Sequence, residues 1–348
     1  MDNKKEQLIH ALVVVGESMK LFAEQAAYEE FNKLIDPDFY QRLNATIERE
    51  KNYNGWFTPD AVRGAMGNVA KWLTKEQLEE WLRDQLFAKS PKQVGVIMAG
   101  NIPFVGFHDF LAIILSGHKA VLKPSSDDQR LWPLLVELIQ FFYPDIVNHV
   151  SISPQLKHID AVIATGSDNS ARYFEKYFGH LPHIIRKNRT SIAVLTGEET
   201  EEELKLLGED VFTYFGLGCR NVSQLLVKDS FDLDRFFAAI IDYAPIVNHH
   251  KYGNNYDYYK AIYLMNREVI TENGFLLTKS SDELFAPTAV LFIKRYTEFS
   301  EVNDYISQNK DKIQVVVGKA FTPFGKAQRP ELTDYADGIN TLDFLKQL

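Results

Sequence analysis

The sequence predicts an α/β protein of two domains with largely parallel sheets, in which a group of helices precedes the first sheet. From residue 93 onward, short apolar runs of strand length alternate with helical segments, as they do in parallel sheets. Before that point, the apolar positions follow only helical spacing. The chain has 348 residues, and because a domain averages about 150 residues, this length fits two domains.

The first ninety residues contain three signals for helices. Residues 5–25 place apolar side chains at helical spacing. Thr58 can cap a helix that begins with Pro59, whose fixed φ suits the first helical position. Thr74 and Gln77 form the pair expected of a capping box. We therefore expect one helix to begin after each of these two threonines.

The following segment alternates strands and helices in the manner of a parallel sheet. The expected strands span residues 93–99, 119–122 and 160–164, and the expected helices span residues 104–116, 131–142 and 170–178. Beyond them, strands are expected at residues 222–228 and 288–293.

An acidic run at residues 197–203 separates the two halves of the chain. It is either a domain junction or the first turn of a solvated helix, where acidic side chains are favoured. Taking the junction as the boundary, we predict a first domain at residues 1–196 and a second at residues 197–348. The C-terminal tail of the second domain is a candidate oligomerisation segment.

The composition argues against several classes of protein. The net charge of −9 disfavours a nucleic-acid binder, which needs clustered lysines and arginines to neutralise phosphates. No apolar run approaches the roughly 20 residues that cross a bilayer, and the polar N-terminus lacks the apolar stretch of a secretory signal. One cysteine cannot form an internal disulfide. We therefore expect a cytoplasmic protein without membrane insertion.

The single cysteine, Cys219, is a candidate nucleophile because Gly216 and Gly218 come just before it. Glycines remove side-chain bulk and would let a substrate approach the thiol. If a helix begins here, its backbone N–H groups could lower the thiol pKa and stabilise an oxyanion. The competing interpretation is a buried cysteine that serves as a small apolar filler.

Three further segments follow expected strands, at the sheet edge where open α/β sheets bind ligands. Asn101 can donate its side-chain N–H₂ to an oxyanion, or it can be an ordinary turn or helix-cap residue. Lys123 ends the second strand, and Gly166 with Ser167 opens a helix whose backbone N–H groups could hold a phosphate. The Gly-x-Gly-x-x-Gly fingerprint of ordinary dinucleotide-binding folds is missing from the sequence.

In this order the segments resemble the aldehyde dehydrogenase superfamily. That family has a strand with an Asn-bearing loop, a Lys-Pro-Ser turn, a Gly-Ser helix start, a cysteine after a small-residue loop and a Glu-x-Phe-Gly-Pro turn. In this chain the last turn spans Asp282–Pro287, and Ala286 replaces its glycine. The resemblance implies an aldehyde-dehydrogenase-like fold, with the N-terminal helices and a nicotinamide-cofactor domain first and the cysteine domain second.

Within that superfamily, the chain resembles acyl-CoA reductases of the LuxC type, which supply fatty aldehyde in bacterial bioluminescence. The phrases that carry this are Trp56–Pro59, Asn101–Pro103 and Gly218–Ser223. The resemblance implies reduction of an acyl-CoA, or another acyl thioester such as an acyl-protein, to an aldehyde by an enzyme that forms a homo-oligomer. It implies Cys219 and Asn101 as catalytic residues and no metal. The implied cofactor-binding residues are Lys123, Ser126, Gly166, Ser167, Glu283 and Phe285.

Two departures from the family pattern bear on the reaction. Hydrolytic relatives have a Glu-Leu-Gly-Gly strand whose glutamate activates water, and we match that position to Val194, which cannot take a proton. Glu198 and Glu199 lie close by in sequence and could supply the base instead. Ser126 stands where NAD-preferring relatives typically have a glutamate that binds the ribose, so we expect NADPH as the cofactor, with NADH as the alternative.

Two other functions stay open on the sequence. A hydrolytic aldehyde dehydrogenase would oxidise aldehydes to acids, and a catalytically silent relative would only bind a nucleotide.

A metal site at His249 and His250 is disfavoured, because adjacent side chains diverge on a helix. Basic residues at 186, 187 and 189 are either phosphate ligands or a solvated turn. Tyrosines at 252, 256, 259 and 263 follow helical spacing, as core or subunit-contact residues do, and they could also line an acyl tunnel.

Overall fold

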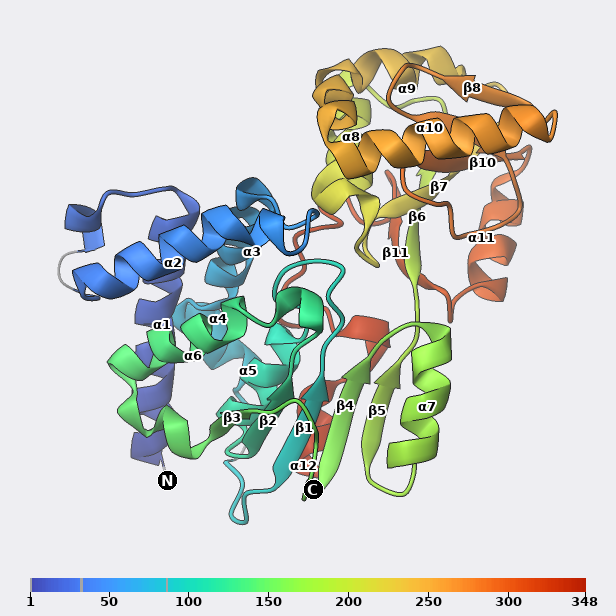
Figure 1. The fold of residues 1–348 in the computed structure, drawn as a ribbon. Helices are drawn as coiled ribbons and strands as arrows, with labels where there is room; N and C mark the ends of the chain where they lie inside the picture. The colour runs from blue at the N-terminus through green and yellow to red at the C-terminus, as the bar shows by residue number, and fades with distance from the viewer. Residues whose placement is uncertain (1, 32–33, 86) are drawn as a thin grey trace. The chain divides into compact units, whose positions relative to one another are not determined.

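The computed structural model describes residues 2–31, 34–85 and 87–348, which fold into two compact units (Figure 1). The first unit takes the chain up to Lys187 together with residues 331–348. The second unit takes residues 188–330. Each unit is built around its own mainly parallel sheet, as the sequence predicts.

The N-terminal part of the first unit is helical, as predicted. Its helices are α1 (Asp2–Ala23), α2 (Pro37–Arg49), α3 (Pro59–Trp72) and α4 (Lys75–Trp81). The two predicted caps are confirmed. Thr58 Oγ1 accepts a hydrogen bond from the Ala61 N–H at 3.2 Å, and Thr74 Oγ1 accepts one from the Gln77 N–H at 3.3 Å. These bonds satisfy N–H groups that a helix start leaves without an intrahelical partner.

The sheet of the first unit is parallel throughout, with the strand order β3-β2-β1-β4-β5. Its strands are β1 (Gln93–Ile97), β2 (Lys119–Lys123), β3 (Val150–Ile152), β4 (Ala161–Thr165) and β5 (His183–Arg186). Its connecting helices include α5 (Phe107–Leu115), α6 (Leu131–Phe142) and α7 (Asp168–Phe178). The order reverses direction between β1 and β4, and such a switch point is where doubly wound sheets bind ligands.

The C-terminal tail belongs to the first unit, which corrects the predicted assignment of all residues after 196 to the second domain. In α12 (Thr341–Lys346), the Leu345 carbonyl lies 3.1 Å from Nε2 of the buried His118. Tyr335, just before this helix, accepts a hydrogen bond from the indole N–H of Trp81 at 2.8 Å. Contacts between the C-terminal tail and segments near the start of the chain leave no pattern in the local sequence. The oligomerisation role of the tail stays a prediction.

The sheet of the second unit has the order β11-β6-β7-β10-β9-β8, and only β8 and β9 pair antiparallel. Its strands are β6 (Thr190–Leu195), β7 (Val222–Lys228), β8 (Ile270–Glu272), β9 (Leu277–Ser280), β10 (Val290–Tyr296) and β11 (Ile313–Val317). Its helices are α8 (Glu201–Phe212), α9 (Leu233–Ala239), α10 (His250–Met265) and α11 (Phe299–Gln308).

The boundary between the units lies at residue 187, not at the predicted residue 196. β6 pairs with β7 and β11, so these residues belong to the second sheet. The acidic run is a helix start, because Thr200 and Glu203 form a reciprocal capping box at the first turn of α8. Charge alone could not distinguish a junction from a helix start, and the solvated-helix interpretation is the correct one.

The basic turn and the tyrosine row have structural roles. Arg186 is buried and pairs bidentately with Asp109, at 2.5 and 2.9 Å, so it is neither exposed to a phosphate nor part of a solvated turn. Tyr252, Tyr256 and Tyr263 of α10 are buried, as the core interpretation predicts. Among the described residues, no helix is both long and apolar enough to cross a membrane.

Candidate active site

Cys219 lies in an exposed turn directly before β7. The turn is closed by a hydrogen bond from the Asn221 N–H to the Gly218 carbonyl at 3.0 Å. The interpretation of Cys219 as a buried filler is therefore wrong. No helix begins at Cys219 either, because strand β7 follows the thiol. Activation of Cys219 by a helix N-terminus is thus not available here.

The side chain of Asn221 holds the Cys219 turn from the inside. Its Oδ1 accepts a hydrogen bond from the Gly218 N–H at 2.8 Å, and Asn221 is only 2% exposed. Its Nδ2 donates to the carbonyls of Asp210, Val211 and Thr213 at 3.1, 3.3 and 2.8 Å. These carbonyls lie at the end of α8, where a helix leaves acceptors without intrahelical partners.

Two further contacts fix the turn against the sheet. Ser191, at the start of β6, donates from Oγ to the Cys219 carbonyl at 3.1 Å. The same Oγ accepts a hydrogen bond from the Val315 N–H of β11 at 3.1 Å. Arg220 donates from Nε to the Ala327 carbonyl. Cys219 is therefore an exposed thiol on a turn that is tied to neighbouring segments.

Behind the turn, the buried carboxyl of Asp210 holds the segment that Arg220 contacts. It accepts hydrogen bonds from the Gly325 N–H at 2.7 Å and the Ala327 N–H at 2.9 Å. Burial raises the pKa of Asp210 to about 6, although both of these N–H groups act in the opposite direction. Asp210 is thus a further support of the Cys219 turn.

Glu283 and Phe285 lie in the connection between β9 and β10, and both are exposed. The connection is held to β7 by Gln224, which is 0% exposed. Gln224 Nε2 donates to the carbonyls of Ser281 and Glu283 at 3.0 and 3.1 Å. A pocket of about 260 Å³ is lined by Asp282, Glu283, Leu284, Phe285, Asn309 and Lys312.

The predicted ligand residues of the first unit gather at one sheet edge. Lys123 ends β2 and pairs in register with Ile97 at the end of β1, which also pairs with Ala164 of β4. Asn101 follows β1 and is exposed, as is Ser126 after β2. The structure therefore brings the segments after β1, β2 and β4 together, as the parallel order predicts.

Gly166 and Ser167 follow β4 at the same edge. Ser167 is the N-cap of α7, and its Oγ accepts the Ser170 N–H at 3.3 Å. A Cβ at Gly166 would lie 2.9 Å from the Ser170 Cβ and 3.0 Å from the ring of Phe174. Only glycine therefore lets the chain turn this closely into the helix, whose first N–H groups face outward at the cap.

The loop that carries Asn101 is packed against the turn that carries Ser126. A Cβ at Gly100 would lie 2.5 Å from Ser125 Oγ, so a side chain there would push the two segments apart. Asp128 Oδ2 accepts a hydrogen bond from the Phe104 N–H at 2.9 Å. Phe104 has φ of +61°, a strained value for a residue with a side chain. Asp128 thus helps to keep the Asn101 loop in a strained conformation.

Asp128 should make stability depend on pH. Burial raises its pKa from the ordinary value near 4 to about 8, and the Glu50 carboxylate adds to the rise, against the Phe104 N–H and Arg130. Since the folded state binds this proton more tightly, its stabilising effect is complete below pH 4 and is lost as pH rises through 8. We expect the free energy of unfolding to fall by roughly 1.4 kcal/mol per pH unit between pH 6 and 8 from this group.

Urea unfolding of the wild type and of Asp128→Asn at pH 6, 7 and 8 measures that slope. The neutral amide has no proton to lose, so the difference between the two proteins isolates this carboxyl from other titrating groups. Parallel curves for the two proteins would show that Asp128 does not ionise in this range.

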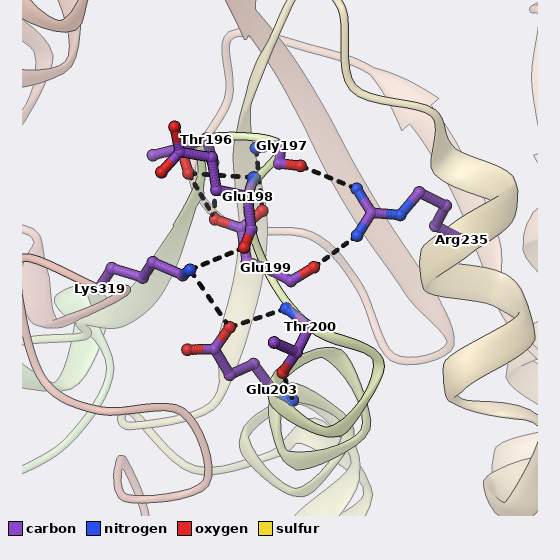
Figure 2. A network of polar contacts seen from close by, with 8 residues as sticks. All are labelled: Thr196, Gly197, Glu198, Glu199, Thr200, Glu203, Arg235 and Lys319. Atoms are coloured by element: carbon purple, nitrogen blue, oxygen red, sulfur yellow. Dashed lines mark hydrogen bonds and ion pairs between the residues drawn. The ribbon is translucent and has the colours of Figure 1, made fainter.

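Glu199 is not available as a base. Its carboxylate accepts hydrogen bonds from the Thr196 N–H, the Thr196 hydroxyl and the Gly197 N–H at 2.7, 2.9 and 2.9 Å, and the residue is 1% exposed. Figure 2 shows these bonds together with Arg235, which donates to the carbonyls of Gly197 and Glu199. Lys319 completes the network by donating to the Glu198 carbonyl at 2.7 Å. The network fixes the loop between β6 and α8.

That loop also lies at the wrong end of the sheet for Glu198 or Glu199 to serve Cys219. β6 and β7 are parallel, with Ser191 opposite Val222 and Leu195 opposite Val227. Cys219 precedes β7, whereas the two glutamates follow β6. β6 has six residues, and at about 3.3 Å each its two ends lie roughly 16 Å apart. Neither glutamate can therefore activate water at Cys219.

The match of Val194 to the family's glutamate is wrong for the same reason. Val194 is buried in the core of the second unit, packed in a cluster with Ile192, Leu226 and Leu284. A side chain there points into hydrocarbon and not toward the thiol. A short apolar strand followed by Thr-Gly imitates the family's strand-Gly-Gly pattern in sequence. β5, by contrast, ends at the edge of the first sheet that carries Asn101 and Lys123.

Among the residues that hold the candidate site, sequence reasoning missed Asp128, Ser191, Asp210, Asn221 and Gln224. Asn221 had a signal, because it follows Cys219 within the phrase that carries the family resemblance. The other four had none, since their partners lie far away along the chain. Across the described residues, no cluster of His, Cys, Asp or Glu could hold a metal ion. His249 instead packs its ring against Phe215, with centroids 4.3 Å apart.

Comparison with known proteins gives one partial sequence match and many similar folds. No protein-family model matches the chain. A long-chain acyl-protein thioester reductase from Aliivibrio fischeri is 28% identical over 124 residues, which cover 31% of this chain and 26% of that protein. This chain thus aligns with about a quarter of the length of its curated relative.

Solved aldehyde dehydrogenases share the fold at low sequence identity. Indole-3-acetaldehyde dehydrogenase from P. syringae, solved with NAD⁺, matches with a TM-score of 0.58 at 13% identity, over 90% of this chain and 76% of its own. An acetylating aldehyde dehydrogenase from Geobacillus thermoglucosidasius gives 0.57 at 12% identity over the same shares. Aldehyde dehydrogenase 21 from Physcomitrella patens gives 0.56 at 12% identity, over 96% of this chain and 82% of its own. The chain therefore has the aldehyde dehydrogenase fold, and part of it resembles an acyl-protein thioester reductase of the LuxC type.

Proposed function

We propose that this chain reduces an acyl thioester, an acyl-CoA or an acyl-protein, to an aldehyde, with NADPH as the reductant and Cys219 as the nucleophile. The observation that carries the proposal is the exposed thiol of Cys219 on a turn fixed by buried hydrogen bonds, in a chain with this fold. The partial match to an acyl-protein thioester reductase supports the substrate class.

In the first half-reaction, the Cys219 thiolate attacks the carbonyl carbon of the thioester. A new carbon–sulfur bond forms to Cys219, and the bond to the departing thiol breaks. One thiolate replaces another at the carbonyl carbon, and a thiolate leaves without being protonated, so no strong acid is needed. Asn101 and the Cys219 backbone N–H are assigned to the oxyanion, a role that fixed donors perform well in sites shielded from water.

The carboxyl edge of the first sheet fits a nicotinamide dinucleotide. Lys123 ends β2 half-buried, and the N-terminus of α7 at Ser167 offers N–H groups to a phosphate. Lys123, Ser126, Gly166 and Ser167 would hold the adenosine and pyrophosphate part, and Glu283 with Phe285 the nicotinamide part. When bound, the reduced cofactor supplies a hydride, so that acyl thioester, NADPH and a proton give aldehyde, thiol and NADP⁺. Release of the aldehyde returns the Cys219 thiolate.

Reduction is favoured over hydrolysis because a base for water is not evident. Glu198 and Glu199 lie at the far edge of the second sheet, and Glu199 is buried. Residues 183–189, which form β5 and the link that follows it, include no Asp or Glu. An acyl group on Cys219 would therefore persist until a hydride arrives.

Single-turnover labelling tests the proposal. The protein is mixed with decanoyl-CoA without cofactor, and the mass gain on Cys219 is measured by mass spectrometry. We expect a stoichiometric acyl-enzyme that releases little acid and yields decanal once NADPH is added. Release of decanoic acid at a similar rate with and without cofactor would identify a hydrolase. A protein that is never acylated by any of several chain lengths would be a silent nucleotide-binding relative.

Ser126 is expected to favour NADPH over NADH. A serine leaves room for the 2′-phosphate and can donate a hydrogen bond to it, whereas a carboxylate would repel it. Ser126→Glu should therefore lower kcat/KM for NADPH by at least about tenfold, as expected for a loss near 1.4 kcal/mol, with a smaller change for NADH. Steady-state kinetics with both cofactors measure the ratio. A wild type that uses NADH at least as well as NADPH would refute this assignment.

We further propose that the protein acts in the cytoplasm as a homo-oligomer. The proposed location rests on the single cysteine, and the assembly rests only on the family resemblance.

A further inference from the structure

Two buried amide side chains in the second unit have no role in the reaction as proposed, yet each supports one loop that does. Asn221 lies two residues after Cys219, and Gln224 lies three residues further along, in β7. The side chain of Asn221 contacts backbone groups of the Cys219 turn and the end of α8. Gln224 contacts the connection that carries Glu283. Their partner sets do not overlap.

The segment before Cys219 needs such a support because its backbone is strained. Tyr214, Phe215 and Gly216 have φ values of +52°, +59° and +77° in succession. Left-handed backbone costs roughly 1 kcal/mol or more for a residue with a side chain, and it persists only where surrounding contacts impose it. Asn221 bridges the two ends of this segment, from Thr213 to Gly218. Its four hydrogen bonds therefore hold the approach to the thiol in one conformation.

Gln224 holds the Glu283 connection in a similar way. Its Nε2 donates to the Ser281 and Glu283 carbonyls, and its Oε1 accepts from the Tyr305 hydroxyl at 2.9 Å. The same hydroxyl contacts the Asp282 carbonyl at 3.0 Å. All polar atoms of this buried amide are thus used to fix residues 281–283. A buried polar group with every partner satisfied specifies one local arrangement.

We propose that Asn221 is a positioning residue for acyl transfer to Cys219 and that Gln224 is a positioning residue for the reductive step at the Glu283 connection. This inference rests on the proposed function. It adds that two residues three positions apart, Asn221 just before β7 and Gln224 within it, serve the two half-reactions separately. Loss of one amide should therefore impair one step more than the other.

Asn221→Ala and Gln224→Ala test this division, and each variant is the matched control of the other. Three rates are measured: alkylation of Cys219 by iodoacetamide, acyl transfer from decanoyl-CoA without cofactor, and aldehyde release after NADPH is added to the preformed acyl-enzyme. Because the chain has one cysteine, alkylation reports only the accessibility and reactivity of that thiol, and thermal unfolding checks that each variant is folded.

For Asn221→Ala we expect acyl transfer to slow by about 10- to 100-fold, since small misplacements of a reacting group have effects of this size. Alkylation, which needs no aligned carbonyl, should change by less than about threefold. For Gln224→Ala we expect alkylation and acyl transfer within about threefold of wild type, and aldehyde release from the acyl-enzyme slowed about tenfold or more. A general loss of structure would instead slow acyl transfer and aldehyde release together, while the exposed thiol would stay open to alkylation.

The outcomes separate this inference from the proposed function. A wild type that is never acylated contradicts the function itself. A wild type that is acylated, with Gln224→Ala slowing acyl transfer as much as aldehyde release, overturns the division. So does an Asn221→Ala protein whose acyl transfer falls no further than its alkylation. If Asn221→Ala does not fold, Asn221→Ser retains one donor for the α8 carbonyls, and the same comparison of alkylation with acyl transfer applies.

Discussion

Cys219→Ala should abolish acyl labelling and all production of aldehyde. The variant has no thiol anywhere in the chain, because Cys219 is the only cysteine, so a covalent thioester cannot form at another cysteine. Cys219→Ser should be nearly as inactive, since a hydroxyl at neutral pH is a far poorer nucleophile without an adjacent base. The measurement is the acyl adduct by mass spectrometry after mixing with decanoyl-CoA, alongside NADPH oxidation.

Both variants should fold normally. The thiol is exposed, and the hydrogen bonds that shape the turn come from backbone groups and from the side chains of Ser191, Arg220 and Asn221. Unchanged thermal unfolding would show that the loss is chemical. A serine variant that keeps a near-normal rate would mean that catalysis does not proceed through a thioester on this residue.

The strands whose carboxyl ends carry the predicted ligand residues of the first unit could be predicted from the sequence. β1, β2 and β4 are continuous apolar runs, and their following segments must meet at one edge because parallel strands share their direction. Asn101, Lys123 and Ser167 could therefore be grouped without a structure. Cys219 could be singled out because glycines before it leave the thiol uncovered.

The errors came from features that local patterns do not encode. The link at residue 187 has no glycine or proline, so it gave no sign that one sheet ends there and another begins. The match of Val194 to the family's glutamate rests on the Thr-Gly that follows its strand. Only the pairing of β6 with β7 shows which end of that strand lies near Cys219. The C-terminal tail returns to α5 and α4 through contacts between residues far apart in the sequence, such as those of Tyr335 with Trp81 and of Leu332 with His108.

Asn101→Ala is expected to slow acyl transfer to Cys219 by about 10²–10³, the usual effect of removing one oxyanion donor. The substitution should leave the loop in place. Asp128 holds it through the Phe104 N–H, and Gly100 packs directly against Ser125. The effect should therefore fall on the rate of acyl-enzyme formation and not on thermal stability. Rapid-quench labelling with decanoyl-CoA measures that rate directly.

Two variants sharpen the interpretation of that loss. Asn101→Asp keeps the shape of the side chain but places a negative charge where charge develops, so it should be slower still than alanine. Asn148→Ala removes an exposed asparagine elsewhere in the first unit and should act like wild type. If Asn101→Ala and Asn148→Ala were acylated equally fast, Asn101 would be a turn residue without a catalytic role. The Asn101 loop is strained at Phe104, and the buried carboxyl of Asp128 holds it in that conformation. Such strain lowers the stability of the fold and persists only where surrounding contacts impose it. A loop held in one conformation is what a positioned oxyanion donor would require.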